Sequence, residues 1–131
     1  MREKPLIGCI YPRRSGNQEF VVYNHGPIKT QNGLARVEGV GMGLCLIQTA
    51  CFRALMNTGK ITVRARSNRS LLGFFDPEPV DGEYSSEDYS FCRRWRTLCG
   101  GEVWGLVSEQ IGHVGERVYR GRPPDTDDAL R

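Results

Sequence analysis

Two adjacent carboxylates, Glu87 and Asp88, are the first candidates for chemistry in this sequence. They follow Ser85 and Ser86 and precede an apolar periodic segment, so they stand at the start of an expected helix. A carboxylate acts as a general base when its surroundings raise its pKa, whereas the dipole at a helix N-terminus lowers that pKa. The spacing therefore leaves two interpretations open: a catalytic base, or two acids that stabilise the helix start.

His113 is the second candidate. It stands between Gly112 and Gly115 in an apolar segment, and such small neighbours let a ligand or an ion approach the ring. A neutral imidazole is a common ligand of Mn²⁺ or Zn²⁺. One histidine does not make a metal site, and no HxxH or CxxC pattern accompanies it. The alternative is a partly buried histidine with a structural role.

A glycine cluster over residues 39–43 is the third candidate, because glycines let the backbone approach a ligand closely. Its spacing fits neither GxGxxG nor the phosphate-binding P-loop, so a tight backbone bend is the alternative interpretation. The two tryptophans are the fourth candidate. We assign Trp95 and Trp104 to the core, although an exposed Trp104 would be able to stack on a sugar or a base.

These residues need elements to position them, and the clearest element is a helix over 86–98. Phe91, Trp95 and Leu98 recur at helical spacing, a capping box begins at Ser85 or Ser86, and glycines 100 and 101 end the helix. A second helix is expected over 50–57, with Thr49 as its N-cap. Strands are expected over 5–11, 20–23, 34–40, 102–107 and 111–114 and, with a weaker pattern, within 61–69, whereas 76–85 reads as an exposed loop. This order favours an α/β fold with helices packed on a sheet.

The composition describes one globular domain. The chain has 131 residues, 39% of them hydrophobic, and a formal net charge of +3, which is too small to indicate nucleic-acid binding by itself. The longest apolar-rich run, 40–52, is shorter than the roughly 20 residues of a membrane span, and no apolar signal sequence follows Met1. All five cysteines lie in apolar segments without a CxxC pair. We therefore expect reduced thiols and a cytoplasmic protein without a membrane span.

Several segments in order resemble bacterial and phage glycosyltransferases of the GT-A fold. The downstream half follows the pattern "SEDY-F-RRW…GG-W…H-G…Y-G", and the upstream half follows "I-GG-YP-K", "V-GVGTGF-LI" and "-FFD". The matching segments are 7–13 (IGCIYPR), 37–47 (VEGVGMGLCLI), 71–76 (LLGFFD), 85–96 (SSEDYSFCRRWR), 100–104 (GGEVW), 113–115 (HVG) and 119–121 (YRG). The resemblance covers residues 6–121, with Met42 in place of the usual Thr or Ser.

The resemblance implies a partial GT-A fold: a glycosyltransferase C-terminal-half domain over 1–121 and a flexible polar tail over 122–131. In that family a nucleotide-binding half precedes the "YP" strand and ends in an Asp-x-Asp motif. Here the Asp-x-Asp pattern occurs only at Asp125 and Asp127, in the tail. The resemblance therefore implies either the acceptor-side half of a glycosyltransferase or a truncated reading frame. Such a half would be inactive alone, and a partner chain is one possible source of the nucleotide-binding half.

The resemblance also implies roles for the candidate residues. Asp88 would deprotonate an acceptor hydroxyl for inverting transfer from a nucleotide-sugar, and Glu87 would orient that base or contact the glycan acceptor. His113 would complete the shell of a Mn²⁺ or Mg²⁺ ion once the missing half is supplied, and Gly41 and Gly43 would line the sugar pocket. Two other classes stay open: a catalytically silent binding or assembly module derived from that fold, and a small Arg-rich nucleic-acid-binding protein.

Overall fold

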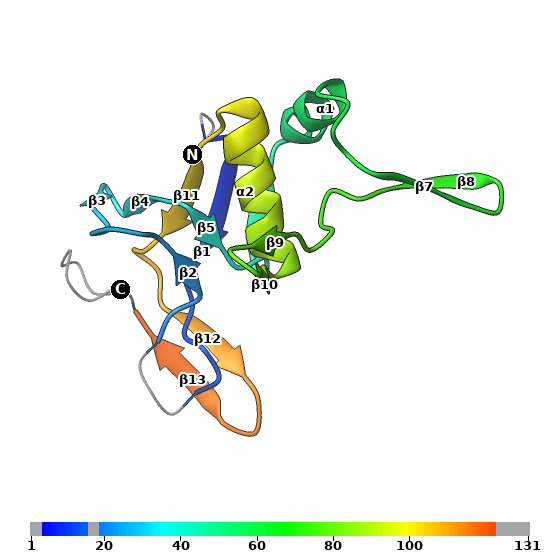
Figure 1. Ribbon diagram of the computed structural model, residues 1–131. Coiled ribbons are helices and arrows are strands. Elements are labelled where there is room, and N and C mark those ends of the chain that lie inside the picture. The colour runs from blue at the N-terminus through cyan, green and yellow to red at the C-terminus, as the bar shows by residue number, and fades with distance from the viewer. Residues whose placement is uncertain (1–3, 16–18, 123–131) are drawn as a thin grey trace.

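The computed structural model describes residues 4–15 and 19–122 of the chain (Figure 1). This part is a mixed α/β structure with two helices and mostly short strands. In chain order the elements are β1 (Leu6–Cys9), β2 (Val22–Tyr23), β3 (Thr30–Gln31), β4 (Leu34–Val37), β5 (Gly39–Val40), β6 (Cys45–Ile47), α1 (Thr49–Asn57), β7 (Val63–Arg66), β8 (Arg69–Leu72), β9 (Pro79–Val80), β10 (Glu83–Tyr84), α2 (Glu87–Cys99), β11 (Val103–Leu106), β12 (Ile111–Val114) and β13 (Val118–Gly121).

A five-stranded mixed sheet forms the centre, in the order β3-β4-β11-β1-β6. The strands β1 and β11 run parallel, with Ile7 opposite Trp104, and the other pairings in this sheet are antiparallel. The residues of β1 are all buried, as its continuous apolar run predicts. The expected α/β class with helices on a sheet is confirmed at this level.

The helix α2 packs across the sheet, in front of β1 in Figure 1. Its buried face includes Phe91, Cys92 and Trp95, and the helix ends at Gly100, whose positive φ of 62° suits glycine. The predicted stripe is therefore confirmed except at Leu98, which is 38% exposed. The N-cap is Ser86 rather than Ser85, and its hydroxyl forms no capping bond to the backbone.

The helix α1 begins one residue earlier than expected. Gln48 is its N-cap and Thr49 is already helical, so the assignment of Thr49 as the cap is wrong. Cys51 and Leu55, one turn apart, are buried in the common core. The helix ends near Thr58, whose hydroxyl donates a hydrogen bond to the Leu55 carbonyl at 2.6 Å.

Three segments differ from their predicted form. The strand expected over 34–40 is divided at Glu38, so that β4 pairs with β11 while β5 pairs with β2. Residues 76–85 are not a plain loop, because they hold the hairpin β9–β10 with Asp81 and Gly82 at positive φ in its turn. Residues 63–72 form the antiparallel hairpin β7–β8, which extends away from the body and is exposed along its whole length (Figure 1).

Trp104 is only partly buried, and the Lys4 ammonium lies 3.6 Å from the centre of its ring. Its assignment to the core is therefore wrong, because this strand turns alternate residues to opposite faces of the sheet. All five cysteines are free, as expected. No helix in the described ranges is long and apolar enough to cross a membrane. The tail predicted over 122–131 lies outside the described residues except for Arg122.

Candidate active site at the carboxyl end of the parallel strands

The parallel pair β1 and β11 defines the end of the sheet where the candidate residues gather. Tyr11 follows β1, and the hairpin β12–β13 with His113 follows β11. The first turn of α2 lies at the same end, because the helix runs antiparallel to β11, into which it leads (Figure 1). Ligand sites of open α/β sheets lie outside the carboxyl ends of parallel strands.

Tyr11 is the residue around which this end is organised, and the sequence analysis did not single it out. Its hydroxyl accepts a hydrogen bond from the Gly43 backbone N–H at 3.3 Å. A Cβ atom would lie 2.5 Å from that hydroxyl oxygen at Gly41 and 2.7 Å at Gly43. The two glycines therefore make room for the phenol of Tyr11, and Tyr11 fills the space where the resemblance places a sugar.

His113 packs edge-on against Tyr11, with 5.2 Å between the ring centres. Its Nδ1 atom lies 2.9 Å from the Pro12 carbonyl oxygen. Because a carbonyl only accepts, Nδ1 carries the hydrogen and Nε2 of the neutral ring keeps its lone pair. A hydrogen bond from the other ring nitrogen to a carbonyl also orients histidines that bind metals.

Asp88 uses one of its carboxylate oxygens inside the helix start. Its Oδ1 atom accepts hydrogen bonds from the Ser86 hydroxyl and from the Tyr89 backbone N–H, the latter at 2.9 Å. Its Oδ2 atom makes no hydrogen bond to the described residues, so it is available to a ligand. Glu87 is exposed and makes no polar contact within the described chain. The interpretation that Asp88 stabilises the helix start thus explains the hydrogen bonds of Oδ1. It assigns no role to Oδ2, which could act as a base.

Tyr11 is the residue of this end that both candidates influence. It contacts the ring of His113, and the Asp88 charge acts on its phenol. Burial raises the pKa of Tyr11, the hydrogen bond from Gly43 lowers it, and the Asp88 carboxylate raises it. The phenol therefore stays protonated at neutral pH and remains a hydrogen-bond donor.

Tyr89 contributes a second phenol, which the sequence analysis also missed. Burial raises the pKa of Tyr89, Arg13 lowers it, and Asp88 and Tyr11 raise it further. The hydroxyl oxygen of Tyr89 is buried without a hydrogen-bond partner among the described residues. Such a group costs stability unless a ligand or a solvent molecule completes its hydrogen bonding.

The described residues do not fit a complete metal site. No three histidine, cysteine or acidic side chains in the described ranges are grouped so that they would hold a metal ion. His113 offers one nitrogen ligand, and a single imidazole does not hold a divalent ion. The described residues alone therefore do not complete the coordination shell of a divalent ion.

A polar cleft lies on the neighbouring face of α2, and the sequence analysis did not predict it. It has a volume of about 470 Å³ and lies between α2, the β2–β5 pair and the β9–β10 hairpin. At one wall His25 Nδ1 lies 2.5 Å from the Glu38 carboxylate, and His25 Nε2 lies 2.9 Å from the Tyr23 hydroxyl. Because a carboxylate only accepts, Nδ1 donates to Glu38 and Nε2 of the neutral ring accepts from Tyr23.

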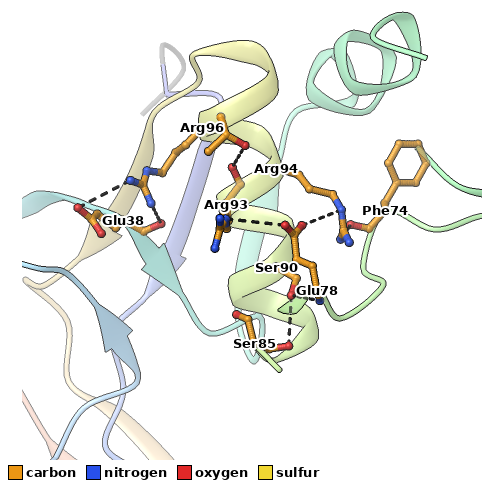
Figure 2. A network of polar contacts seen from close by, with 9 residues as sticks. Glu38, Phe74, Glu78, Ser85, Ser90, Arg93, Arg94 and Arg96 are labelled. Atoms are coloured by element: carbon orange, nitrogen blue, oxygen red, sulfur yellow. Dashed lines mark hydrogen bonds and ion pairs between the residues drawn. The ribbon is translucent and has the colours of Figure 1, made fainter. Parts of the chain in front are cut away.

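The arginines of α2 fix this wall in place. Arg96 donates to the Glu38 backbone carbonyl at 3.2 Å and lies 3.7 Å from its carboxylate (Figure 2). In the sequence His25 lies in the turn cluster 24–27, and Glu38 is one of the polar residues of the alternating segment 34–40. No pattern indicated that the two side chains would meet.

The other wall, the β9–β10 hairpin, is held to α2 by Glu78, which directly precedes β9. Glu78 lies 3.0 Å from Arg94 and 3.8 Å from Arg93, and its backbone N–H donates to the Ser90 hydroxyl at 3.1 Å (Figure 2). The Ser90 hydroxyl in turn donates to the Ser85 carbonyl at 3.2 Å. Both walls of the cleft are therefore attached to α2 through its polar face.

Comparison of the sequence with models of known protein families, with curated proteins and with solved structures finds no match.

Proposed function

We propose that this chain is the acceptor-side half of a GT-A-type glycosyltransferase, which transfers a sugar from a nucleotide-sugar to an acceptor hydroxyl. The observation that carries the proposal is the contact of Tyr11 with the His113 ring at the carboxyl end of β1 and β11, the end at which the first turn of α2 also lies. That turn carries Asp88, whose Oδ1 is held by hydrogen bonds and whose Oδ2 makes none to the described residues. The sequence resemblance names the same aspartate and histidine.

In this proposal Asp88 accepts the proton of the acceptor hydroxyl through Oδ2. The Ser86 hydroxyl and the Tyr89 N–H hold Oδ1, so the carboxylate has a fixed orientation. The acceptor oxygen then attacks the anomeric carbon, and the nucleotide diphosphate leaves from the opposite face, which inverts the configuration. A base held in this way acts at the transition state and is not needed to bind the donor.

The buried phenol of Tyr89 supports a ligand at this position. The charges of Arg13 and Asp88 act on its hydroxyl, which has no hydrogen-bond partner among the described residues. A hydroxyl of the acceptor would complete the hydrogen bonding of this group. Uncommitted buried donors are typical of sites that await a polar ligand.

The proposal also includes a nucleotide-binding half that holds the donor and a divalent ion, supplied by another part of the same protein or by a partner chain. The cytoplasmic location inferred from the reduced thiols belongs to it as well. In such a complex Asp88 and His113 would face the bound donor from the acceptor side.

The test supplies that half. The chain is combined with the nucleotide-binding half of a glycosyltransferase of the resembled class, as a separate chain or fused ahead of Met1, and turnover of a panel of nucleotide-sugars is measured with Mn²⁺. We expect turnover in the complex, less than about a tenth of it in the chain alone, and a kcat lower by roughly 10²–10⁴-fold in Asp88→Asn. The donor KM should stay within about threefold, because a base acts in the transition state.

Glu87→Gln is the matched control, since it removes the same charge one residue away. Its exposed side chain has no polar contact in the described chain, so its effect on kcat should be far smaller. Equal losses in the two variants would refute the assignment of Asp88 as the base. Turnover by no combination would instead favour a catalytically silent binding or assembly module.

A further inference from the structure

The cleft on the polar face of α2 is a second site, separate from the Asp88 end. Its volume of about 470 Å³ lies within the roughly 300–1,000 Å³ of small-molecule sites. Tyr89 and Ser85 contribute to its lining, whereas Asp88, between them in sequence, does not. The cleft and the proposed base are therefore neighbours on adjacent faces of the first turn of α2.

Three tyrosines give the cleft an aromatic lining. Tyr23 and Tyr89 lie with their ring centres 5.7 Å apart and their planes tilted by 36°. Tyr84, on the β9–β10 hairpin, is 80% exposed and makes no ring contact in the described chain. Tyrosine combines an apolar ring face with a polar tip, which suits a ligand that has both C–H faces and hydroxyl groups.

The polar groups of the cleft carry both signs of charge. Arg93 and Arg96 stand on α2, opposite Glu38 on one wall and Asp81 and Glu83 on the other. A phosphate or a nucleotide would meet these carboxylates as well as the arginines, and like charges repel. A neutral ligand with many hydroxyl groups can donate to the carboxylates and accept from the guanidinium groups.

The hydrogen-bonded group of Glu38, His25 and Tyr23 in the cleft wall is held in one orientation without a ligand. Glu38 receives Arg96 and the His25 N–H, and His25 in turn holds the Tyr23 hydroxyl. Groups fixed in this way lose little side-chain entropy when a ligand binds.

From these observations we propose that the cleft binds a sugar residue of the acceptor glycan other than the one that reacts. That the sugar belongs to an acceptor rests on the proposed function. That the cleft binds a sugar at all rests on the lining of the cleft alone. Because Asp88 does not line the cleft, the role of a sugar held here is to anchor the acceptor rather than to give its proton to the base. Binding energy from such a remote part of a substrate helps to position the reacting part.

The test measures binding to the 131-residue chain without any donor or partner. Neutral methyl glycosides and linear trisaccharides of glucose, galactose and N-acetylglucosamine are titrated and followed by saturation-transfer difference NMR. We expect ring-proton signals for at least one sugar at millimolar concentration. Tyr84→Ala should weaken binding at least fivefold, whereas Tyr84→Phe, which keeps the ring, should bind within about twofold of the parent. The exposure of Tyr84 makes both variants compatible with folding.

Three outcomes would overturn this inference. They are the absence of signal for every sugar at 10 mM, displacement of the bound sugar by inorganic phosphate, and equal binding by the parent and Tyr84→Ala. Asp88→Asn separates the inference from the proposed function, because it should abolish turnover in the complex and leave sugar binding unchanged. Loss of sugar binding in Asp88→Asn would place the sugar at the Asp88 end and refute a separate cleft site.

Discussion

Replacing Tyr89 by phenylalanine should make this protein more stable. The phenol oxygen of Tyr89 is buried and has no hydrogen-bond partner among the described residues. Leaving a buried polar group unsatisfied costs about 1–3 kcal/mol, and phenylalanine keeps the ring while it removes the oxygen. We therefore expect the free energy of unfolding to rise by about 1–2 kcal/mol in Tyr89→Phe.

The assay is reversible urea unfolding followed by tryptophan fluorescence, with thermal unfolding as a second measurement. For a chain of this length, each kcal/mol of added stability raises the Tm by roughly 3–5 °C. Tyr84→Phe is the matched control, because its hydroxyl belongs to a side chain that is 80% exposed and its removal should change little. A loss of stability in Tyr89→Phe larger than in Tyr84→Phe would show that the Tyr89 hydroxyl is bonded within the protein, and would refute the reasoning.

Three further predictions concern the thiols and the glycines. Burial raises the pKa of Cys45 to about 12 and that of Cys92 to about 11, so above pH 9 the unfolded chain loses thiol protons that the folded chain keeps. The free energy of unfolding should therefore fall as the pH rises from 9 to 11, and Cys92→Ala should flatten this fall; an unchanged slope in urea titrations across that range would contradict the prediction. All five cysteines should react with a thiol reagent in the denatured, unreduced protein, and a count of three or one would reveal disulfides. Gly41→Ala should cost about 1–3 kcal/mol through overpacking against the Tyr11 hydroxyl and the Val21 side chain. Tyr11→Phe relieves the first of these contacts, so the double variant should cost less than the sum of the two single variants, a coupling that urea unfolding of all four proteins measures.

The elements whose signals are local were predictable from the sequence. The apolar spacing of Phe91 and Trp95 and the glycine at position 100 place α2 correctly to within a residue at each end. The same reasoning predicts the buried strand β1, because a short apolar run that ends before a proline is typical of a buried strand. Asp88 and His113 were singled out by residue type and by the family resemblance, and the structure relates both to Tyr11.

The features that were missed depend on contacts between distant parts of the chain. The alternation over 34–40 continues smoothly, but at Glu38 the backbone changes its partner from β11 to β2, and its N–H donates to the Tyr23 carbonyl at 3.1 Å. Tyr11 looks like the end of a strand until Gly43 and His113 are brought beside it. No local pattern carries such information, because these contacts exist only after the sheet has formed.

The pairing of β1 with β11 also governs the order in which this protein folds. These neighbouring central strands come from opposite ends of the described chain, with Ile7 opposite Trp104. Closing so long a loop costs entropy before its contacts contribute, so high contact order slows the assembly of such a sheet. On the ribosome β1 must wait, without its parallel neighbour, until nearly all of the described chain has been made. A chain released before residue 103 lacks the strand that joins β4 to β1, and its sheet would remain in two unconnected parts with exposed edges, a form prone to aggregation.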